Sequence, residues 1–128
     1  STLAYTLFPY TTLFRSGPHQ VRMEYMPAPL HAGMTITDEP GIYVAGKFGV
    51  RIENTLLIES DQTTDFGSFL KMDSLTLCPI DTTPVDMALL TLEEREWLNA
   101  YHERVYTELA PLLNVEEKEW LRKETKKI

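Results

Sequence analysis

The sequence is poor in cysteine, in positive charge and in long apolar runs. Its one cysteine, Cys78, cannot form an internal disulfide, which fits a reducing compartment, and we expect it to be a small core residue rather than a nucleophile. Twelve Lys and Arg against 19 Asp and Glu give a net charge of -7, which argues against nucleic acid and anionic membranes as partners. No apolar run approaches the roughly 20 residues that span a bilayer, and no signal peptide is convincing. The 128 residues therefore predict a soluble chain of about one domain.

The first sixteen residues are expected to differ in origin from the rest. Residues 6–16, TLFPYTTLFRS, are identical to the translation of a widely used short-read sequencing adaptor. We therefore expect residues 1–16 to be artefactual sequence joined to a truncated gene, and we leave them out of the fold prediction. The alternative is an apolar strand, which the Thr, Tyr and Phe content permits.

The remaining chain has two halves of different character. Residues 17–80 are rich in Gly, Pro and short β-branched runs, whereas residues 91–128 are rich in Glu, Leu, Trp and Lys at helical spacing. MTITDEP predicts a short strand that Pro40 stops, and PGIYVAGKFG predicts a strand and a loop. SFLKMDSLTLCPI, residues 68–80, predicts a strand that Pro79 ends. The expected fold class is α+β, with strands first and helices after.

The segment from Val50 to Ile58 alternates between two faces with the period of a β-strand. Its apolar face, expected in the core, holds Val50, Ile52, Leu56 and Ile58. Its other face holds Arg51, Glu53 and Thr55. A polar face usually contacts solvent, but Leu57 shares this one, so we expect it to be partly enclosed.

Two helices are predicted in the second half by their start signals. Thr91 with Glu94, and Asn114 with Glu117, have the spacing of capping boxes. Pro111 separates the two helices. The first carries an apolar stripe of Leu98, Tyr101, Val105 and Leu109, and the second carries Trp120 and Leu121. Arg122, Lys123, Lys126 and Lys127 follow, where positive charge offsets the helix dipole; nucleic-acid binding by this cluster is a weaker alternative.

Two acids stand in an otherwise apolar stretch. Glu39 precedes a Pro-Gly turn, and Glu53 lies between an isoleucine and an asparagine. Carboxylate oxygens suit hard divalent cations, and a pair of close cations needs a carboxylate that bridges them. Glu39 and Glu53 could form such a site if both project from the same face, but the residues alone leave this open.

The stretch GMTITDEPGIYVAGKFGVRIENTLLI resembles the Xaa-Pro aminopeptidases, within the peptidase M24 family of creatinase and methionine aminopeptidase. The resemblance runs from Gly17 to about the end of the chain, and the EPG and RIEN motifs at this separation are specific to it. It implies that residues 17–80 are the C-terminal part of a pita-bread catalytic domain with antiparallel strands. Residues 81–128 would then be a C-terminal extension that forms a helical hairpin.

The resemblance also implies an activity and a metal centre. The family removes the N-terminal residue from peptides with proline in second position, using hydroxide activated by two divalent ions, commonly manganese. The ions have five protein ligands: two aspartates, one histidine and two glutamates. Glu39 matches the glutamate of EPG, a terminal ligand, and Glu53 matches that of RIEN, which bridges both ions. Arg51 is expected to orient the ligands; a plain surface charge is the alternative.

The other three ligands belong to family segments that precede Gly17. Gly17 and Pro18 look like the end of the family's His-Glu-Gly-Pro motif. We therefore expect a fragment that carries two of five ligands, has no catalytic residue of its own and is inactive alone. His19, His31 and His102 match no catalytic position and are expected on the surface or in packing.

The parent enzyme is expected to be cytoplasmic, to act on peptides and to form a homodimer through its helical tail. The alternative is a non-catalytic module derived from the pita-bread fold, used for peptide or protein binding or for dimerisation. The presence of both Glu39 and Glu53 argues against this alternative, because a binding module has no need of metal ligands.

Overall fold

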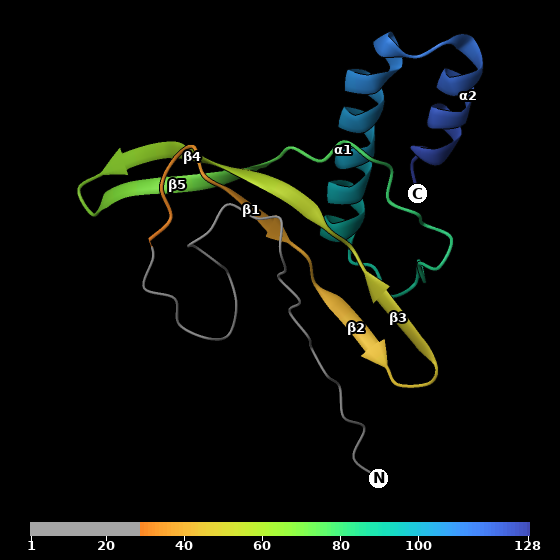
Figure 1. The fold of residues 1–128 in the computed structure, drawn as a ribbon, viewed down its shortest axis with the longest axis horizontal. Helices are drawn as coiled ribbons and strands as arrows, with labels where there is room; N and C mark the ends of the chain where they lie inside the picture. The colour runs from red at the N-terminus through yellow and green to blue at the C-terminus, as the bar shows by residue number, and fades with distance from the viewer. Residues whose placement is uncertain (1–28) are drawn as a thin grey trace. The chain divides into compact units, whose positions relative to one another are not determined.

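The computed structural model describes residues 29–128; the predictions for the adaptor-like stretch and for Gly17, Pro18 and His19 lie outside them. The chain divides into two compact units, residues 1–76 and 77–128. Figure 1 shows strands in the first and helices in the second, so the predicted α+β order is confirmed. Within residues 29–128, no helix has the length and apolar character needed to cross a membrane.

Five strands form two antiparallel ladders in the described part of the first unit. The three-stranded sheet has the order β1–β4–β5, with bounds Thr35–Asp38, Asn54–Thr64 and Gly67–Ser74. Strands β2 (Gly41–Val44) and β3 (Phe48–Arg51) pair as a hairpin. Pro40 follows β1 as predicted, since proline has no N–H for the ladder. Gly46, in the turn of the hairpin, has a φ of 71°, which glycine adopts without strain.

The segment expected as one strand from Val50 to Ile58 is two strands. β3 ends at Arg51 and β4 begins at Asn54, because β3 pairs with β2 whereas β4 pairs with β1 and β5. Ile58 is 1% exposed and lies in the core as predicted. Val50 and Ile52 are 48% and 46% exposed, so their prediction as core residues was wrong. Alternation predicts which residues share a face, but not whether another layer covers that face.

Strand β5 ends at Ser74, five residues before the predicted stop at Pro79. The amide of Leu75 still donates to the carbonyl of Thr55 at 2.8 Å. The next acceptor is a side chain, because Oγ1 of Thr76 accepts from the amide of Thr55 at 2.8 Å. A hydroxyl thus takes the place of a backbone carbonyl, and the regular ladder stops there.

The second unit contains helix α1 (Leu92–Leu109), a 3-10 turn (Ala110–Leu112) and helix α2 (Val115–Glu124). Both predicted capping boxes are confirmed. The amide of Glu94 donates to Oγ1 of Thr91 at 3.2 Å, and Oε2 of Glu94 accepts from the amide of Thr91 at 2.8 Å. Pro111 lies in the 3-10 turn that separates the helices, as expected.

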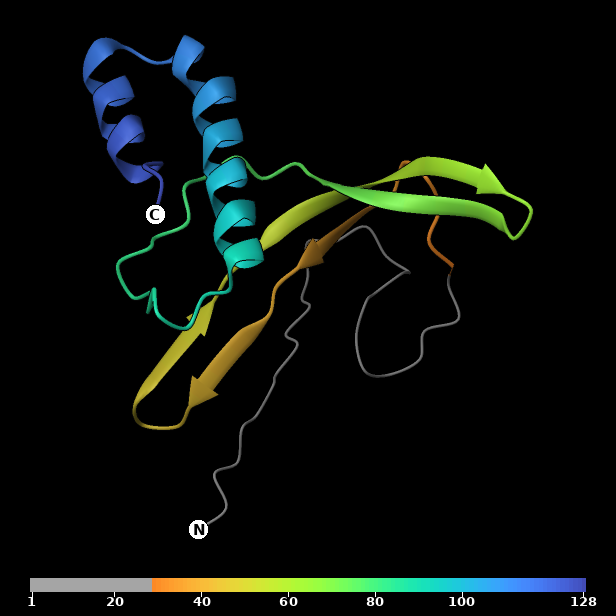
Figure 2. The same cartoon turned by 180° about the vertical axis from the view of Figure 1, so that it is seen from behind.

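The helices pack against each other through the predicted stripe. Leu98, Tyr101 and Val105 of α1 are buried, and Leu121 of α2 completes the cluster at 1% exposure. Leu109 packs at its edge. Figure 2 shows α1 and α2 side by side, so the helical hairpin is confirmed.

Helix α1 also holds the extended segment that precedes it. The hydroxyl of Tyr101 accepts from the amide of Cys78 at 3.4 Å and donates to its carbonyl at 3.0 Å. The amide of Ile80 donates to Nε2 of His102 at 3.1 Å. These bonds fix the backbone and leave Cys78 exposed, so its prediction as a core residue was wrong.

Candidate metal-binding site

The two ladders of the first unit share one register. The β1–β4 ladder reaches Asp38 opposite Asn54, and the β2–β3 ladder starts with Gly41 opposite Arg51. Continuing the first ladder by one pair places Glu39 opposite Glu53, and two further pairs reach Gly41 and Arg51. The amide of Ile52 donates to the carbonyl of Pro40 at 3.3 Å, which joins the ladders across the interruption. The two glutamates thus occupy matching positions where the ribbon is interrupted.

The opposed positions of Glu39 and Glu53 bear on a question that the sequence leaves open, namely whether both side chains project from the same face. In a regular antiparallel pair, directly opposed residues lie on one face with Cβ atoms about 4.5–5.5 Å apart. Glu53 is an exposed residue directly before β4, whereas the side chain of Glu39 is 6% exposed. The register is compatible with a shared site, and the metal-binding role of the two glutamates stays a prediction.

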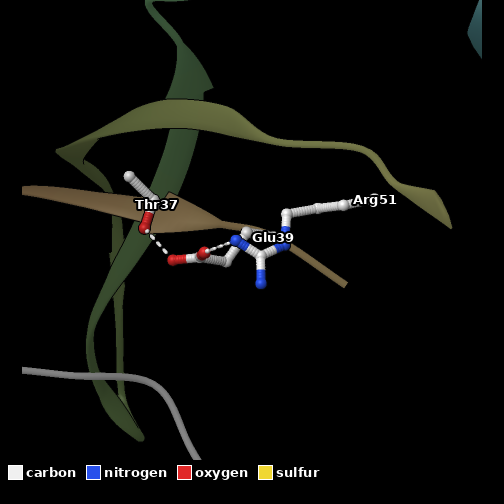
Figure 3. Close-up of polar contacts among 3 residues, drawn as sticks. All are labelled: Thr37, Glu39 and Arg51. Atoms are coloured by element: carbon white, nitrogen blue, oxygen red, sulfur yellow. Dashed lines mark hydrogen bonds and ion pairs between the residues drawn. The ribbon is translucent and has the colours of Figure 1, made fainter. Parts of the chain in front are cut away.

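The carboxylate of Glu39 is held at both oxygens (Figure 3). Oγ1 of Thr37 donates to Oε1 at 2.9 Å, and Nη1 of Arg51 lies 3.2 Å from Oε2. Thr37 and Glu39 are two residues apart, so the alternation of the strand places them on one face. Because a buried carboxylate is costly without compensation, the guanidinium of Arg51 offsets its charge. Arg51 therefore contacts the candidate ligand Glu39 directly.

An aromatic ring lies beside this ion pair. The guanidinium of Arg51 lies 5.7 Å from the centre of the Tyr43 ring, a cation–π distance. The ring covers two positions without side chains: a Cβ added at Gly41 would lie 2.8 Å from it, and one at Gly49 2.6 Å. A side chain at either glycine would therefore overlap the Tyr43 ring in its present position.

An open pocket of about 370 Å³ borders Glu39. Its wall combines the polar residues Thr37 and Asp38 with the apolar residues Ile36, Leu56 and Met72. The pocket belongs wholly to the first unit. It gives the Glu39 end of β1 an accessible space next to a buried charge.

The donor type of these residues fits hard divalent cations, but their number does not complete a site. Carboxylate oxygens suit Mg²⁺, Ca²⁺ and Mn²⁺. Across residues 29–128, no cluster of three or more His, Cys, Asp or Glu could hold a metal ion. Two carboxylates supply fewer ligands than the roughly six that such ions take. The described part of the chain therefore carries at most part of a metal centre.

The histidines of the described residues do not line the pocket beside Glu39. His31 is exposed in the turn before β1. His102 is fully buried in the helical unit and accepts the Ile80 amide, so it is a packing residue, one of the two roles expected for it. Burial lowers the pKa of His102 below its usual 6.5.

Sequence reasoning found Glu39 and Arg51 but missed Thr37 and Tyr43. The signal for Thr37 was its place two residues before Glu39 on the same strand, which gives both side chains one face. Tyr43 had a weaker signal, a tyrosine between glycines in a hairpin. Its contact with Arg51 depends on the β2–β3 register, which the alternation of residues alone does not fix.

Two family models match this chain over most of its length. Residues 11–60 match metallopeptidase family M24, and residues 68–128 match the C-terminal region of peptidase M24. The first match contains Glu39, Arg51 and Glu53, and the second contains both helices.

Curated relatives agree with these matches. Aminopeptidase P1 of Arabidopsis thaliana is 43% identical over 117 residues, which are 88% of this chain and 18% of the relative. Xaa-Pro aminopeptidase 1 of Dictyostelium discoideum is 38% identical over 89 residues, 68% of this chain and 14% of the relative. The chain thus spans less than a fifth of the length of these proteins.

A solved structure shares the fold. It is an X-prolyl aminopeptidase from Caenorhabditis elegans, described as a cytosolic enzyme with a dinuclear active site. It matches with a TM-score of 0.77 and 38% identity, over 88% of this chain and 19% of the solved one. The predicted fold, the C-terminal part of a pita-bread domain with a helical tail, is therefore confirmed.

Proposed function

Since the chain belongs to metallopeptidase family M24, we propose that it is the C-terminal portion of an Xaa-Pro aminopeptidase and supplies two ligands of its metal centre. The substrates of the whole enzyme are proposed to be peptides with proline in second position, which is supported by the relatives named as Xaa-Pro and X-prolyl aminopeptidases. The chain spans less than a fifth of those relatives, so we propose this activity for the parent protein and expect the chain alone to be inactive.

The shared register of the two ladders is the observation that supports this proposal. It sets Glu39 and Glu53 at opposed positions, and it places Arg51 where its guanidinium contacts Glu39. We propose Glu39 as a terminal ligand, Glu53 as a bridging ligand and Arg51 as the residue that orients Glu39. Two divalent cations, with manganese as our expectation, would activate water and stabilise negative charge on the substrate.

The residues of this chain then have two tasks. Glu39 and Glu53 bring negative charge to the metal centre. Before cations bind, the guanidinium of Arg51 offsets the charge of the nearly buried Glu39 carboxylate. Tyr43 supports Arg51 by a cation–π contact at 5.7 Å. We expect the parent to be cytoplasmic, like the relative described as cytosolic, and to form a homodimer through its helical tail.

A pair of glutamate variants tests the metal role. In the complete enzyme, Glu53→Ala should abolish turnover of an Xaa-Pro peptide and lower the bound metal measured by elemental analysis. Glu59→Ala is the matched control, since Glu59 lies within β4, the strand that follows Glu53, and forms an exposed pair with Lys71 at 3.4 Å. Normal activity and metal content in Glu53→Ala would remove the bridging role.

The chain itself provides a second test. Residues 17–128, assayed on the same peptide with added manganese, should show no turnover, because two carboxylates cannot fix a two-ion geometry. A rate comparable to that of a complete enzyme would refute the assignment as an incomplete part. Aspartates and a histidine upstream at the family's positions would favour the enzyme, and their loss would favour a binding module.

A further inference from the structure

Thr37 makes a contact that the metal role of Glu39 alone does not require. Its Oγ1 donates to Oε1 of Glu39 at 2.9 Å, while Oε2 faces Arg51 at 3.2 Å (Figure 3). A glutamate side chain has three rotatable bonds, so one charged partner leaves the plane of its carboxylate free to turn. A second contact at the other oxygen fixes that plane.

Thr37 is well suited to this task. It is β-branched, which restricts its χ1 angle and hence the direction of its hydroxyl. It lies on β1, paired opposite Thr55 of β4, so its backbone is fixed by the sheet. The donor is thus held by the ladder, whereas Glu39 lies beyond the last residue of β1. The hydroxyl of a residue within the ladder is thus directed at the carboxylate of the residue just beyond it.

We infer that Thr37 is a positioning residue, whose hydroxyl fixes the Glu39 carboxylate in the orientation that ligates a divalent cation. The inference deepens the proposed function and rests on it for the metal. It predicts that the orientation of Glu39 depends on the hydroxyl group at position 37 and not on the shape of that side chain. Valine keeps the shape of threonine without the donor, and serine keeps the donor without the methyl group.

The test compares Thr37→Val, Thr37→Ser and the control Thr55→Val in the 128-residue chain. Thr55→Val makes the same chemical change on the same face of the sheet, directly opposite Thr37. The first readout needs no metal: side-chain NMR couplings of ¹³C-labelled Glu39, assigned by the signal lost in Glu39→Gln. We expect one rotamer in the wild type, in Thr37→Ser and in Thr55→Val, and rotamer averaging in Thr37→Val.

The second readout is a Mn²⁺ titration, followed by the paramagnetic loss of the Glu39 signal. Losing a hydrogen bond of about 1 kcal/mol should raise the half-effect concentration about fivefold in Thr37→Val, with recovery in Thr37→Ser. A single Glu39 rotamer in Thr37→Val would overturn the inference. Rotamer averaging in Thr37→Val with an unchanged half-effect concentration would refute the link between this contact and metal binding. Unchanged bound metal in the complete enzyme carrying Glu39→Ala would instead refute the proposed ligand role, while Thr37 would still position Glu39.

Discussion

The sheet unit and the helical unit bury their apolar residues to different extents. In residues 77–128, Leu98, Val105 and Leu121 form a core with exposures of 7% or less. In the described part of residues 1–76, the buried apolar residues are Ile36 and Ile58. The same part exposes nine large apolar side chains, at 44% to 94%: Ile42, Phe48, Val50, Ile52, Phe66, Phe69, Leu70, Met72 and Leu75.

The difference shows which part of the chain specifies its own packing. An amphipathic hairpin of two helices can close a core between two stripes. A sheet has two faces, and each apolar face needs another layer to cover it. The helical unit is therefore expected to be the more stable of the two, while the candidate metal site lies in the unit that has less core of its own.

The strongest test of this comparison is Leu121→Ala. Leu121 is 1% exposed at the contact between the helices, so its truncation leaves a cavity. We expect the free energy of unfolding of the helical unit to fall by about 3 kcal/mol. The measurement is urea denaturation followed by far-UV circular dichroism, which reports helix and strand content.

Two controls define the outcome. Leu112→Ala makes the same change at a side chain that is 80% exposed and should stay within about 0.5 kcal/mol of wild type. Met72→Ala, at a 53% exposed position of β5, should also cost little. If Met72→Ala costs as much as Leu121→Ala, the sheet unit has a better packed core than its exposed residues indicate.

The second test is the pH dependence of the helical unit, which His102 should set. Burial lowers the pKa of His102, so below about pH 6.5 the unfolded chain binds a proton that the folded chain resists. Folding stability is therefore complete above pH 6.5 and falls as the pH drops below it, by at most about 1.4 kcal/mol per pH unit. A protonated ring also cannot accept the Ile80 amide.

The measurement is the melting temperature between pH 5 and 7.5, for wild type and two variants. His102→Gln should remove most of this pH dependence, because its amide does not titrate in that range. His31→Gln should keep it, since His31 is exposed. An identical pH profile in His102→Gln and wild type would assign the acid sensitivity to other groups.

The first half of the fold shows how far alternation carries a prediction. It gave the position of β1 and the burial of Ile58, and Pro40 predicted that β1 ends before it, as it does at Asp38. It failed for Val50 and Ile52, because their exposure depends on what covers the hairpin and not on local spacing. The helices were predicted more fully, since capping boxes and stripes are local features that determine both ends and the buried face.

The third test addresses those local features. Thr91→Ala removes the hydroxyl that accepts from the amide of Glu94, and the expected cost is about 1 kcal/mol. Thr107→Ala is the control, an exposed residue inside α1 where alanine should not lower stability. Equal losses in both variants, measured by thermal denaturation, would mean that the cap adds nothing to the core of the helical unit.

The candidate site could be predicted only through its motifs. Glu39, Arg51 and Glu53 were selected because EPG and RIEN carry the resemblance, and the residues alone left a shared face undecided. The register that sets Glu39 opposite Glu53 needed the pairing of β1 with β4, which joins segments 16 residues apart. Thr37 contacts Glu39 two residues further along the chain, a spacing visible in the sequence, whereas Tyr43 contacts Arg51 only because β2 and β3 pair.

The smallest effect is expected for the ion pair of Lys71 and Glu59, which are cross-strand partners in β5 and β4. Both side chains are well exposed, at 56% and 41%, so water and salt screen their attraction. A double-mutant cycle of Glu59→Ala and Lys71→Ala should give a coupling below about 0.5 kcal/mol. A coupling above 1 kcal/mol would show that surface charge pairs stabilise the sheet unit. If the coupling is as small as expected, surface charge pairs cannot offset the exposed apolar faces of the sheet unit. The candidate metal site therefore depends on a covering layer that residues 29–76 do not themselves supply.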